Sequence, residues 1–148
     1  MDIRVVKSEK EKEDAFYVRR VVFVDEQHVP EEEEIDEFEA DAIHFVAYDE
    51  KNGKKPAGAG RLRIIDDIGK VERICVLKEY RTQGLGEKIM KKIETEAAKH
   101  PIEELKLNAQ VQAERFYRRL GYETISGEFF DAGIPHVAMR KAPKTPSE

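Results

Sequence analysis

A glycine-containing loop followed directly by a helix-like segment is the part of this chain best suited to chemistry. The loop spans residues 81–86 and holds Gly84 and Gly86, with a strand-like run at residues 71–76 before it and apolar residues at helical spacing after it. A loop that opens a helix presents backbone N–H groups without partners in the helix, at the positive end of the helix dipole. Such groups bind phosphate without specific side chains, so the sequence predicts a phosphate-bearing cofactor.

Two common nucleotide-binding loops do not fit these residues. A Walker-type loop needs Lys and then Ser or Thr after its last glycine, whereas Glu87 and Lys88 follow Gly86. A dinucleotide-binding fingerprint needs a third glycine three residues further on, where this chain has Ile89. A second pair of glycines earlier in the chain also lacks its third. Both kinds of nucleotide-binding loop are therefore disfavoured.

One α/β domain over residues 1–141 must position the loop. Strands are expected near residues 3–5, 43–49, 57–65, 70–76 and 105–109, with two weaker ones near 122–125 and 136–140. Helices are expected from the Ser8–Glu11 capping box through Val22, from Leu85 to a stop near residues 100–101, and over residues 113–120. Residues 142–148 hold two prolines and are expected to form a flexible tail.

The composition limits the class of protein. The chain has 148 residues, of which 40% are hydrophobic and 39% charged, with one cysteine and therefore no internal disulfide. No apolar run approaches the roughly 18 residues that span a membrane, and the first residues do not resemble a secretion signal, so we expect a cytoplasmic protein. The four histidines lack metal-ligand spacing, and there is no basic stripe with interleaved aromatic residues. Neither a metal site nor a nucleic-acid partner is expected.

The net charge of −5 is concentrated in one segment. Residues 25–41 hold ten acidic residues and no Lys or Arg, whereas the rest of the chain holds 26 bases and 21 acids. A solvated acidic helix or loop is the ordinary interpretation of such a run. The alternative is an acidic surface that attracts a cationic substrate. The sequence leaves both interpretations open.

The loop and its surroundings resemble the Gcn5-related N-acetyltransferase (GNAT) superfamily. Its acyl-CoA signature is Arg or Gln, two residues, Gly, one residue, and Gly or Ala, and residues 81–86 match every defined position. The context is also similar, with a strand before the loop, a helix after it, a strand ending at Asn108, and a second helix carrying Phe116 and Tyr117. The resemblance covers nearly the whole chain. Three further stretches look like the bacterial YjcF-like branch of the superfamily: residues 23–27, 34–36 and 133–136.

The resemblance implies a single-domain fold and a bound acyl-CoA. The fold would be mixed α/β, with a twisted, mostly antiparallel sheet, helices on both faces, and a parallel splay between two central strands. The pantetheine arm of acetyl-CoA would enter this gap, and Asn108, otherwise an ordinary strand-end residue, would contact it. The residues that the resemblance assigns to acetyl-CoA are Ile74, Cys75, Val76, Arg81, Thr82, Gln83, Gly84, Leu85, Gly86, Glu87, Lys88, Asn108, Phe116 and Tyr117.

Two side chains would carry the chemistry that the resemblance implies. Glu72 would remove a proton from the attacking amine, directly or through water, and Tyr117 would protonate the departing thiolate, while the N–H of Val76 stabilises the oxyanion. In a regular strand Glu72 shares a face with Ile74 and Val76. The alternatives are a bulge that turns Glu72 outward or a salt bridge within the sheet. For Tyr117 the alternative is a place in the core, and Cys75 is not expected to be a nucleophile.

The acceptor side of the site is the least defined by the sequence. Glu26 and Gln27, at the end of the first helix, and His136 are candidates for acceptor contacts. The sequence thus predicts an N-acetyltransferase that moves an acetyl group from acetyl-CoA to a primary amine. The acidic segment would attract this acceptor if it is cationic. The rival hypotheses are a catalytically silent acyl-CoA-binding sensor and an enzyme for another acyl group. A monomer and a homodimer are equally compatible with the sequence.

Overall fold

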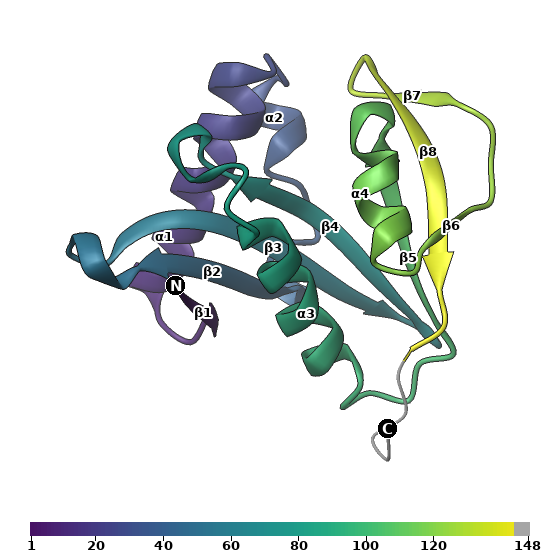
Figure 1. The fold of residues 1–148 in the computed structure, drawn as a ribbon, viewed down its shortest axis with the longest axis horizontal. Helices are drawn as coiled ribbons and strands as arrows, with labels where there is room; N and C mark the ends of the chain where they lie inside the picture. Colours follow the sequence, from purple (N-terminus) through teal and green to yellow (C-terminus); the bar gives the residue numbers. More distant parts are fainter. Residues whose placement is uncertain (144–148) are drawn as a thin grey trace.

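An eight-stranded sheet forms the centre of the protein in the computed structural model, which describes residues 1–143 (Figure 1). The strand order is β1-β2-β3-β4-β5-β8-β6, and β7 pairs with β8. All pairs are antiparallel except β4–β5, which confirms the expected sheet. The strands are β1 (Asp2–Val5), β2 (Ile43–Asp49), β3 (Lys55–Ile65), β4 (Ile68–Val76), β5 (Glu104–Gln110), β6 (Glu123–Thr124), β7 (Phe129–Asp131) and β8 (Ile134–Lys141).

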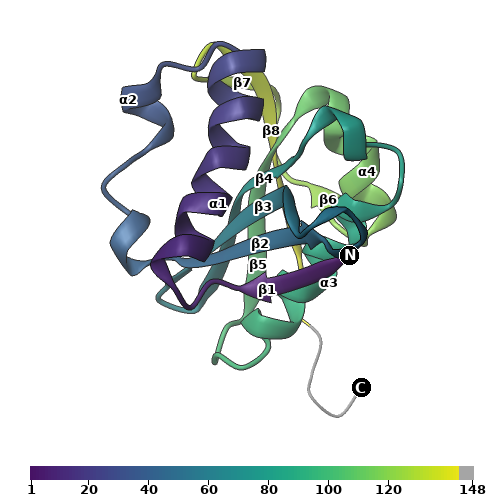
Figure 2. The same ribbon diagram turned by 90° about the vertical axis from the view of Figure 1, so that its left-hand side faces the viewer.

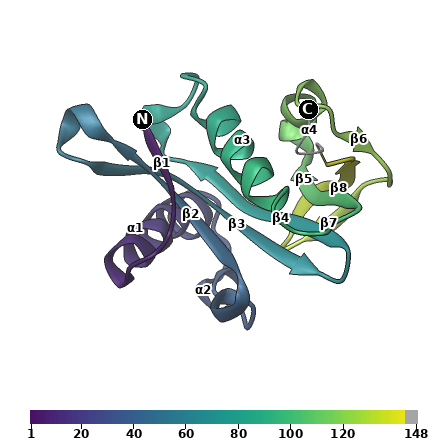
Figure 3. The ribbon, with the colours of Figure 1, turned by 90° about the horizontal axis from the view of Figure 1, so that it is seen from below.

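Helices cover both faces of the sheet, as expected (Figure 3). One face carries α1 (Glu9–Arg19), the π-helical turn η1 (Arg20–Glu26) and the short α2 (Glu31–Glu34), and in Figure 2 α2 lies to the left of α1, further from the strands. The other carries α3 (Leu85–Ala97) and α4 (Glu114–Arg119). Single 3-10 turns connect the elements: η2 (Glu39–Asp41), η3 (Glu50–Asn52), η4 (Lys78–Tyr80) and η5 (Val111–Ala113).

The spacing of apolar residues explains how α3 packs on the sheet. Leu85, Ile89, Ile93 and Ala97 recur every four residues, and all four are buried. Burial of each Leu or Ile side chain stabilises the fold by roughly 1.5–3 kcal/mol. Gly58 on β3 allows the close approach, because a Cβ there would lie 2.6 Å from the Ile89 side chain. The position of α3, which begins at the glycine loop, is therefore fixed relative to the sheet.

The two central strands diverge from one another, as Figure 1 shows for β4 and β5. Their parallel ladder runs only from the pair Ile68–Glu104 to the pair Val71–Leu107. Beyond it, β4 stays paired with β3 and β5 stays paired with β8. Residues 72–76 and 108–110 therefore present free edges to each other, which is the predicted splay.

Several features differ from the sequence-based expectations. The first α-helix ends at Arg19 and continues as the π-helical turn, and strand β7 and helix α2 were not expected. The capping box is confirmed, since the backbone N–H of Glu11 donates to Ser8 Oγ over 3.1 Å. Residues 144–148 of the expected tail lie outside the described residues. Among residues 1–143, no helix has the length and apolar character needed to cross a membrane, and no group of side chains is placed to hold a metal ion.

Candidate functional site

A β-bulge in β4 decides where Glu72 points. Arg73 has φ of +60°, and the register between β3 and β4 shifts so that two residues of β4 lie opposite one of β3. Ile74 and Val76 consequently pack toward the core under α3, whereas Glu72 joins arginines on the face covered by α1 and α2. The prediction that Glu72 shares a face with Ile74 and Val76 is therefore wrong, because it assumed unbroken alternation.

Glu72 is a carboxylate held by two guanidinium groups. Arg61 Nη2 donates to Glu72 Oε1 over 2.9 Å, and Arg63 Nε donates to the same oxygen over 2.7 Å. Burial alone would raise the pKa of Glu72, but the hydrogen bond from Arg63 and the charges of both arginines lower it. Glu72 is thus ionised and lines a cavity at the splay. Both the bulge and the salt bridge considered for it are present.

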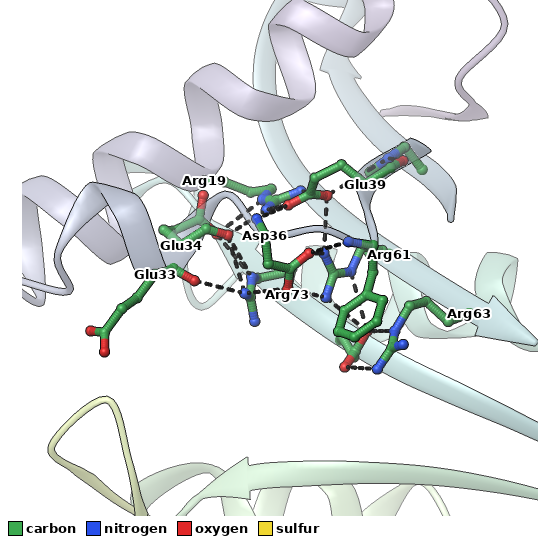
Figure 4. A network of polar contacts seen from close by, with 11 residues as sticks. Arg19, Glu33, Glu34, Asp36, Glu39, Arg61, Arg63 and Arg73 are labelled. Carbon is green, nitrogen blue, oxygen red and sulfur yellow. Dashed lines mark hydrogen bonds and ion pairs between the residues drawn. The ribbon is translucent and has the colours of Figure 1, made fainter. Parts of the chain in front are cut away.

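Glu72 belongs to a buried ion network that fastens the acidic segment to the sheet (Figure 4). Arg19 Nη2 lies 2.6 Å from Glu39 Oε2, and Arg61 Nη1 lies 2.8 Å from Asp36 Oδ1. Arg19 and Arg61 are both fully buried. Four cations balance four anions here: Arg19, Arg61, Arg63 and Arg73 against Glu34, Asp36, Glu39 and Glu72. Part of the acidic segment is therefore a structural element, a role that neither sequence interpretation included.

Two hollows lie at the splay. The first, which we call the splay cavity, has a volume of about 280 Å³, and its lining includes Gln27, Glu72, Asn108, Tyr117 and His136. The second, of about 480 Å³, lies beside the glycine loop and is lined by Val76, Arg81, Gly84, Gly86 and Phe116, among others. The structure therefore gathers residues from distant parts of the chain into two sites, and β4 contributes to both, through Ile74 to the first and Val76 to the second.

Tyr117 is the group of the splay cavity best suited to proton transfer. The residue is only 9% exposed, and its hydroxyl makes no hydrogen bond with residues 1–143. Burial, with a smaller contribution from Cys75, raises the pKa of Tyr117 above its usual value. The phenol therefore stays protonated at neutral pH and has a proton to donate into the cavity.

The glycine loop has the backbone form of an anion site. Gly84 is the N-cap of α3 with φ of +78°, and no side chain caps the helix. The first helical hydrogen bond runs from Lys88 N to the Gly84 carbonyl, so the N–H groups of the first turn are free of helical partners. An added Cβ at Gly84 would meet open space, whereas one at Gly86 would lie 3.2 Å from Phe116. The two glycines thus serve different purposes, one for conformation and one for packing.

The free edge of β4 presents backbone groups to the gap. Leu77 N donates to Ala57 O over 2.9 Å, and because antiparallel ladders alternate, the next residue back, Val76, turns its N–H and carbonyl away from β3. The Val76 carbonyl accepts from Arg81 Nε over 3.0 Å on that side. By the same alternation Cys75 turns its backbone N–H and carbonyl toward β3. Of Ile74, Cys75 and Val76, it is therefore the least suited to backbone contacts with a ligand in the gap. Burial raises the pKa of the Cys75 thiol to about 12, which disfavours a nucleophilic role.

Of the predicted acceptor residues, Gln27 and His136 line the splay cavity, whereas Glu26 lines neither hollow, and each of the three already has a partner. Glu26 accepts from Arg81 Nη2 over 2.7 Å, and Gln27 accepts from Gln110 Nε2 over 2.8 Å across the open end of the splay. His136 Nδ1 lies 2.6 Å from the Ile134 carbonyl, and its ring stacks on Phe129. The cavity residues that were not identified from the sequence include three polar ones, Glu33, Gln110 and Asp131. Asp131 lies at the end of β7, a strand too short to give a periodic signal in the sequence.

Comparisons with known proteins agree with this architecture. A family model described as an acetyltransferase (GNAT) domain matches residues 6–143. The Bacillus subtilis (strain 168) protein YjcF, described as an uncharacterized N-acetyltransferase, is 54% identical over 138 residues, which are 93% of this chain and 96% of YjcF. The crystal structure of Escherichia coli ElaA has a TM-score of 0.82 at 21% identity, covering 95% of this chain and 98% of ElaA.

A further solved structure carries a ligand. An aminoglycoside 6'-N-acetyltransferase complexed with coenzyme A has a TM-score of 0.77 at 14% identity, and the match covers 100% of both chains. Likeness at such low identity shows the fold alone. The family model and the identity to YjcF each extend over nearly the whole chain. The chain therefore belongs to the GNAT family, is related to YjcF, and is an acyltransferase.

Proposed function

We propose that this protein transfers an acetyl group from acetyl-CoA directly to a primary amine, with both substrates bound together. The observation that carries the proposal is Tyr117, a buried residue whose hydroxyl is accessible and has no hydrogen-bond partner among residues 1–143, in the lining of the splay cavity. Acyl transfer to an amine expels a thiolate, and a tyrosine with a raised pKa is a suitable proton donor for it. The rival hypothesis, a silent acyl-CoA-binding sensor, has no use for such a proton donor.

The second hollow is the proposed binding site for acetyl-CoA, which supplies the activated acetyl group. The first-turn N–H groups of α3 would hold the pyrophosphate at the positive end of the helix dipole. Val76, whose N–H turns toward the gap, would donate to the thioester carbonyl oxygen and stabilise the oxyanion. Arg81 and Arg119, which also line this hollow, would balance phosphate charge.

Binding of CoA is the first expected result. At about one hundred times its dissociation constant, CoA or acetyl-CoA should stabilise the fold by roughly 2.7 kcal/mol, which raises Tm by several degrees. ATP and NAD should give no shift. Gly84→Ala should weaken CoA binding about tenfold, because the new Cβ enters the space left for the ligand and strains the loop.

A matched control separates ligand contact from backbone strain. Gly53 also has a positive φ, of +71°, with open space at its Cβ position, but it lies in the turn before β3. Gly53→Ala should therefore cost similar stability and leave the CoA-dependent shift intact. If neither CoA species shifts the Tm of the unmodified protein, the proposed function has to be withdrawn.

The role proposed for Glu72 is indirect. Its Oε1 accepts from Arg61 and Arg63, whereas within residues 1–143 its Oε2 accepts only from Arg63 Nη2, over 3.2 Å. A carboxylate with a lowered pKa is a weak base, so we assign Glu72 to orienting a water molecule through which the amine proton passes to bulk solvent. Glu72 then stays ionised and acts as a positioning residue.

Glu72→Gln should lower kcat about tenfold at pH 7, and the defect should shrink as pH rises, because an amine that is already neutral needs no base. A steady-state pH profile with CoA release as the readout checks this. Asp36→Asn is the matched control, since it also removes a carboxylate from Arg61 but does not line the splay cavity. A defect of equal size at every pH would assign Glu72 to structure alone.

A further inference from the structure

The rim of the splay cavity carries two carboxylates without cationic partners. Glu33 comes from α2 and Asp131 from the end of β7, and both line the cavity. Neither side chain forms an ion pair or hydrogen bond with any residue in the range 1–143. Figure 4 shows the Glu33 carboxylate directed away from the ion network, while its backbone carbonyl accepts from Arg73. These two groups therefore supply negative charge that is not paired with any cation of the described residues.

The other charges of the cavity do not cancel this negative rim. Glu34 and Glu72 are paired with arginines inside the balanced network. Arg73, the arginine that lines the cavity, is held by Glu34 at 2.9 Å and by Asp36 at 3.2 Å. Lys70 also lines the cavity and has no ion-pair partner among residues 1–143, but its backbone lies within the parallel ladder, at the closed end of the splay. The cavity thus has two unpaired carboxylates and one unpaired ammonium, a net negative charge.

The interior of the cavity holds an independent feature that points to a ligand. Tyr117 is more than nine-tenths buried, lines the same cavity as the two rim carboxylates, and has a hydroxyl with no partner among the described residues. In the proposed reaction the attacking amine must be neutral next to this hydroxyl, whereas any second amine of the acceptor would be protonated at neutral pH. A volume of about 280 Å³ admits a short, slender molecule.

We propose that the acceptor is a small aliphatic diamine or polyamine, whose distal ammonium is held between Glu33 and Asp131 while its other amine is acetylated beside Tyr117. This rests on the proposed function and names its substrate class. Charge-assisted hydrogen bonds from an ammonium to two carboxylates orient the molecule along the cavity. Two carboxylates on opposite elements also discriminate against an acceptor that ends in an anion.

Three amines of equal chain length test the proposal: 1,4-diaminobutane, 1-aminobutane and 4-aminobutanoate, each with saturating acetyl-CoA and with release of the CoA thiol as readout. The value of kcat/KM should be at least about tenfold higher for the diamine than for the monoamine, and lowest for the amino acid. In Glu33→Gln/Asp131→Asn the ratio of diamine to monoamine should fall toward one. Glu31→Gln and Glu37→Gln, which change exposed acids of the same segment outside the cavity lining, should preserve the ratio.

The outcomes distinguish a failure of the diamine assignment from a failure of the proposed acetyltransferase function. CoA binding without consumption of any amine overturns the acetyltransferase function, and the diamine assignment with it. Turnover of diamine and monoamine at equal kcat/KM overturns the diamine assignment alone. The diamine assignment is also overturned if Glu33→Gln/Asp131→Asn keeps the full kcat/KM ratio of diamine to monoamine. It is likewise overturned if 4-aminobutanoate is the best of the three amines, or if a lysine-containing peptide is acetylated more efficiently than the diamine.

Discussion

Replacing Tyr117 with phenylalanine is expected to lower kcat at least about 100-fold while the affinity for CoA stays within twofold of its original value. The substitution removes only the hydroxyl, which has no hydrogen-bond partner in the described part of the chain, so it leaves no buried group unsatisfied. It removes the proposed proton donor to the thiolate, and a general acid contributes about 10²- to 10⁴-fold. Steady-state release of CoA thiol and calorimetric CoA titration measure the two quantities separately.

Tyr122 provides the matched control. Its ring centroid lies 6.0 Å from that of Tyr117, and its hydroxyl donates to Glu94 over 2.7 Å. Tyr122→Phe should therefore reduce the free energy of unfolding by about 1–3 kcal/mol, since Glu94 loses a donor, and should leave kcat nearly unchanged. Equal kcat values for Tyr117→Phe and the unmodified enzyme would show that another group, or water, protonates the thiolate.

Arg61→Met should reduce the free energy of unfolding by about 3–5 kcal/mol at pH 7. Arg61 is fully buried, and its guanidinium lies 2.8 Å from Asp36, 3.0 Å from Glu39 and 2.9 Å from Glu72. Its removal leaves these carboxylates in a desolvated region with one cation fewer. Urea unfolding measures the loss, and Lys91→Met is the comparison, because Lys91 and its partner Glu87 are solvent-exposed and their pair contributes at most about 1 kcal/mol.

The loss of unfolding free energy in Arg61→Met should become smaller as the pH falls. Burial would raise the pKa of Glu39, but the hydrogen bond and charge of Arg19 and the charge of Arg61 lower it from 4.5 to about 2. A carboxylate with a lowered pKa contributes stability above pH 4.5, and this contribution disappears as pH falls toward 2. The difference between the unmodified protein and Arg61→Met should therefore narrow between these pH values. A difference that stays constant on acidification would show that the ionised carboxylates are not what Arg61 stabilises.

The sequence was sufficient for the features that depend on near neighbours in the chain. The glycine loop, the capping box at Ser8 and the apolar stripe of α3 each arise from residues within a few positions of one another. Backbone conformation and helical spacing fix such features wherever the segment lies. The match to the GNAT signature is local in the same sense, and the family model bears it out over residues 6–143.

Only the tertiary structure decided the direction of Glu72 and the use of the acidic segment. The bulge at Arg73 reverses the alternation of β4, and the Arg73 side chain contacts Glu34 and Asp36, which lie 39 and 37 positions away in the sequence. Periodicity within a strand contains no information about such partners. The composition of the segment around residues 31–41 likewise shows its charge but not the buried arginines that neutralise part of it. The sequence determined which local elements form, whereas long-range ion pairing determined which carboxylates remain free to meet a substrate, because desolvated charges must find partners wherever the fold brings them together.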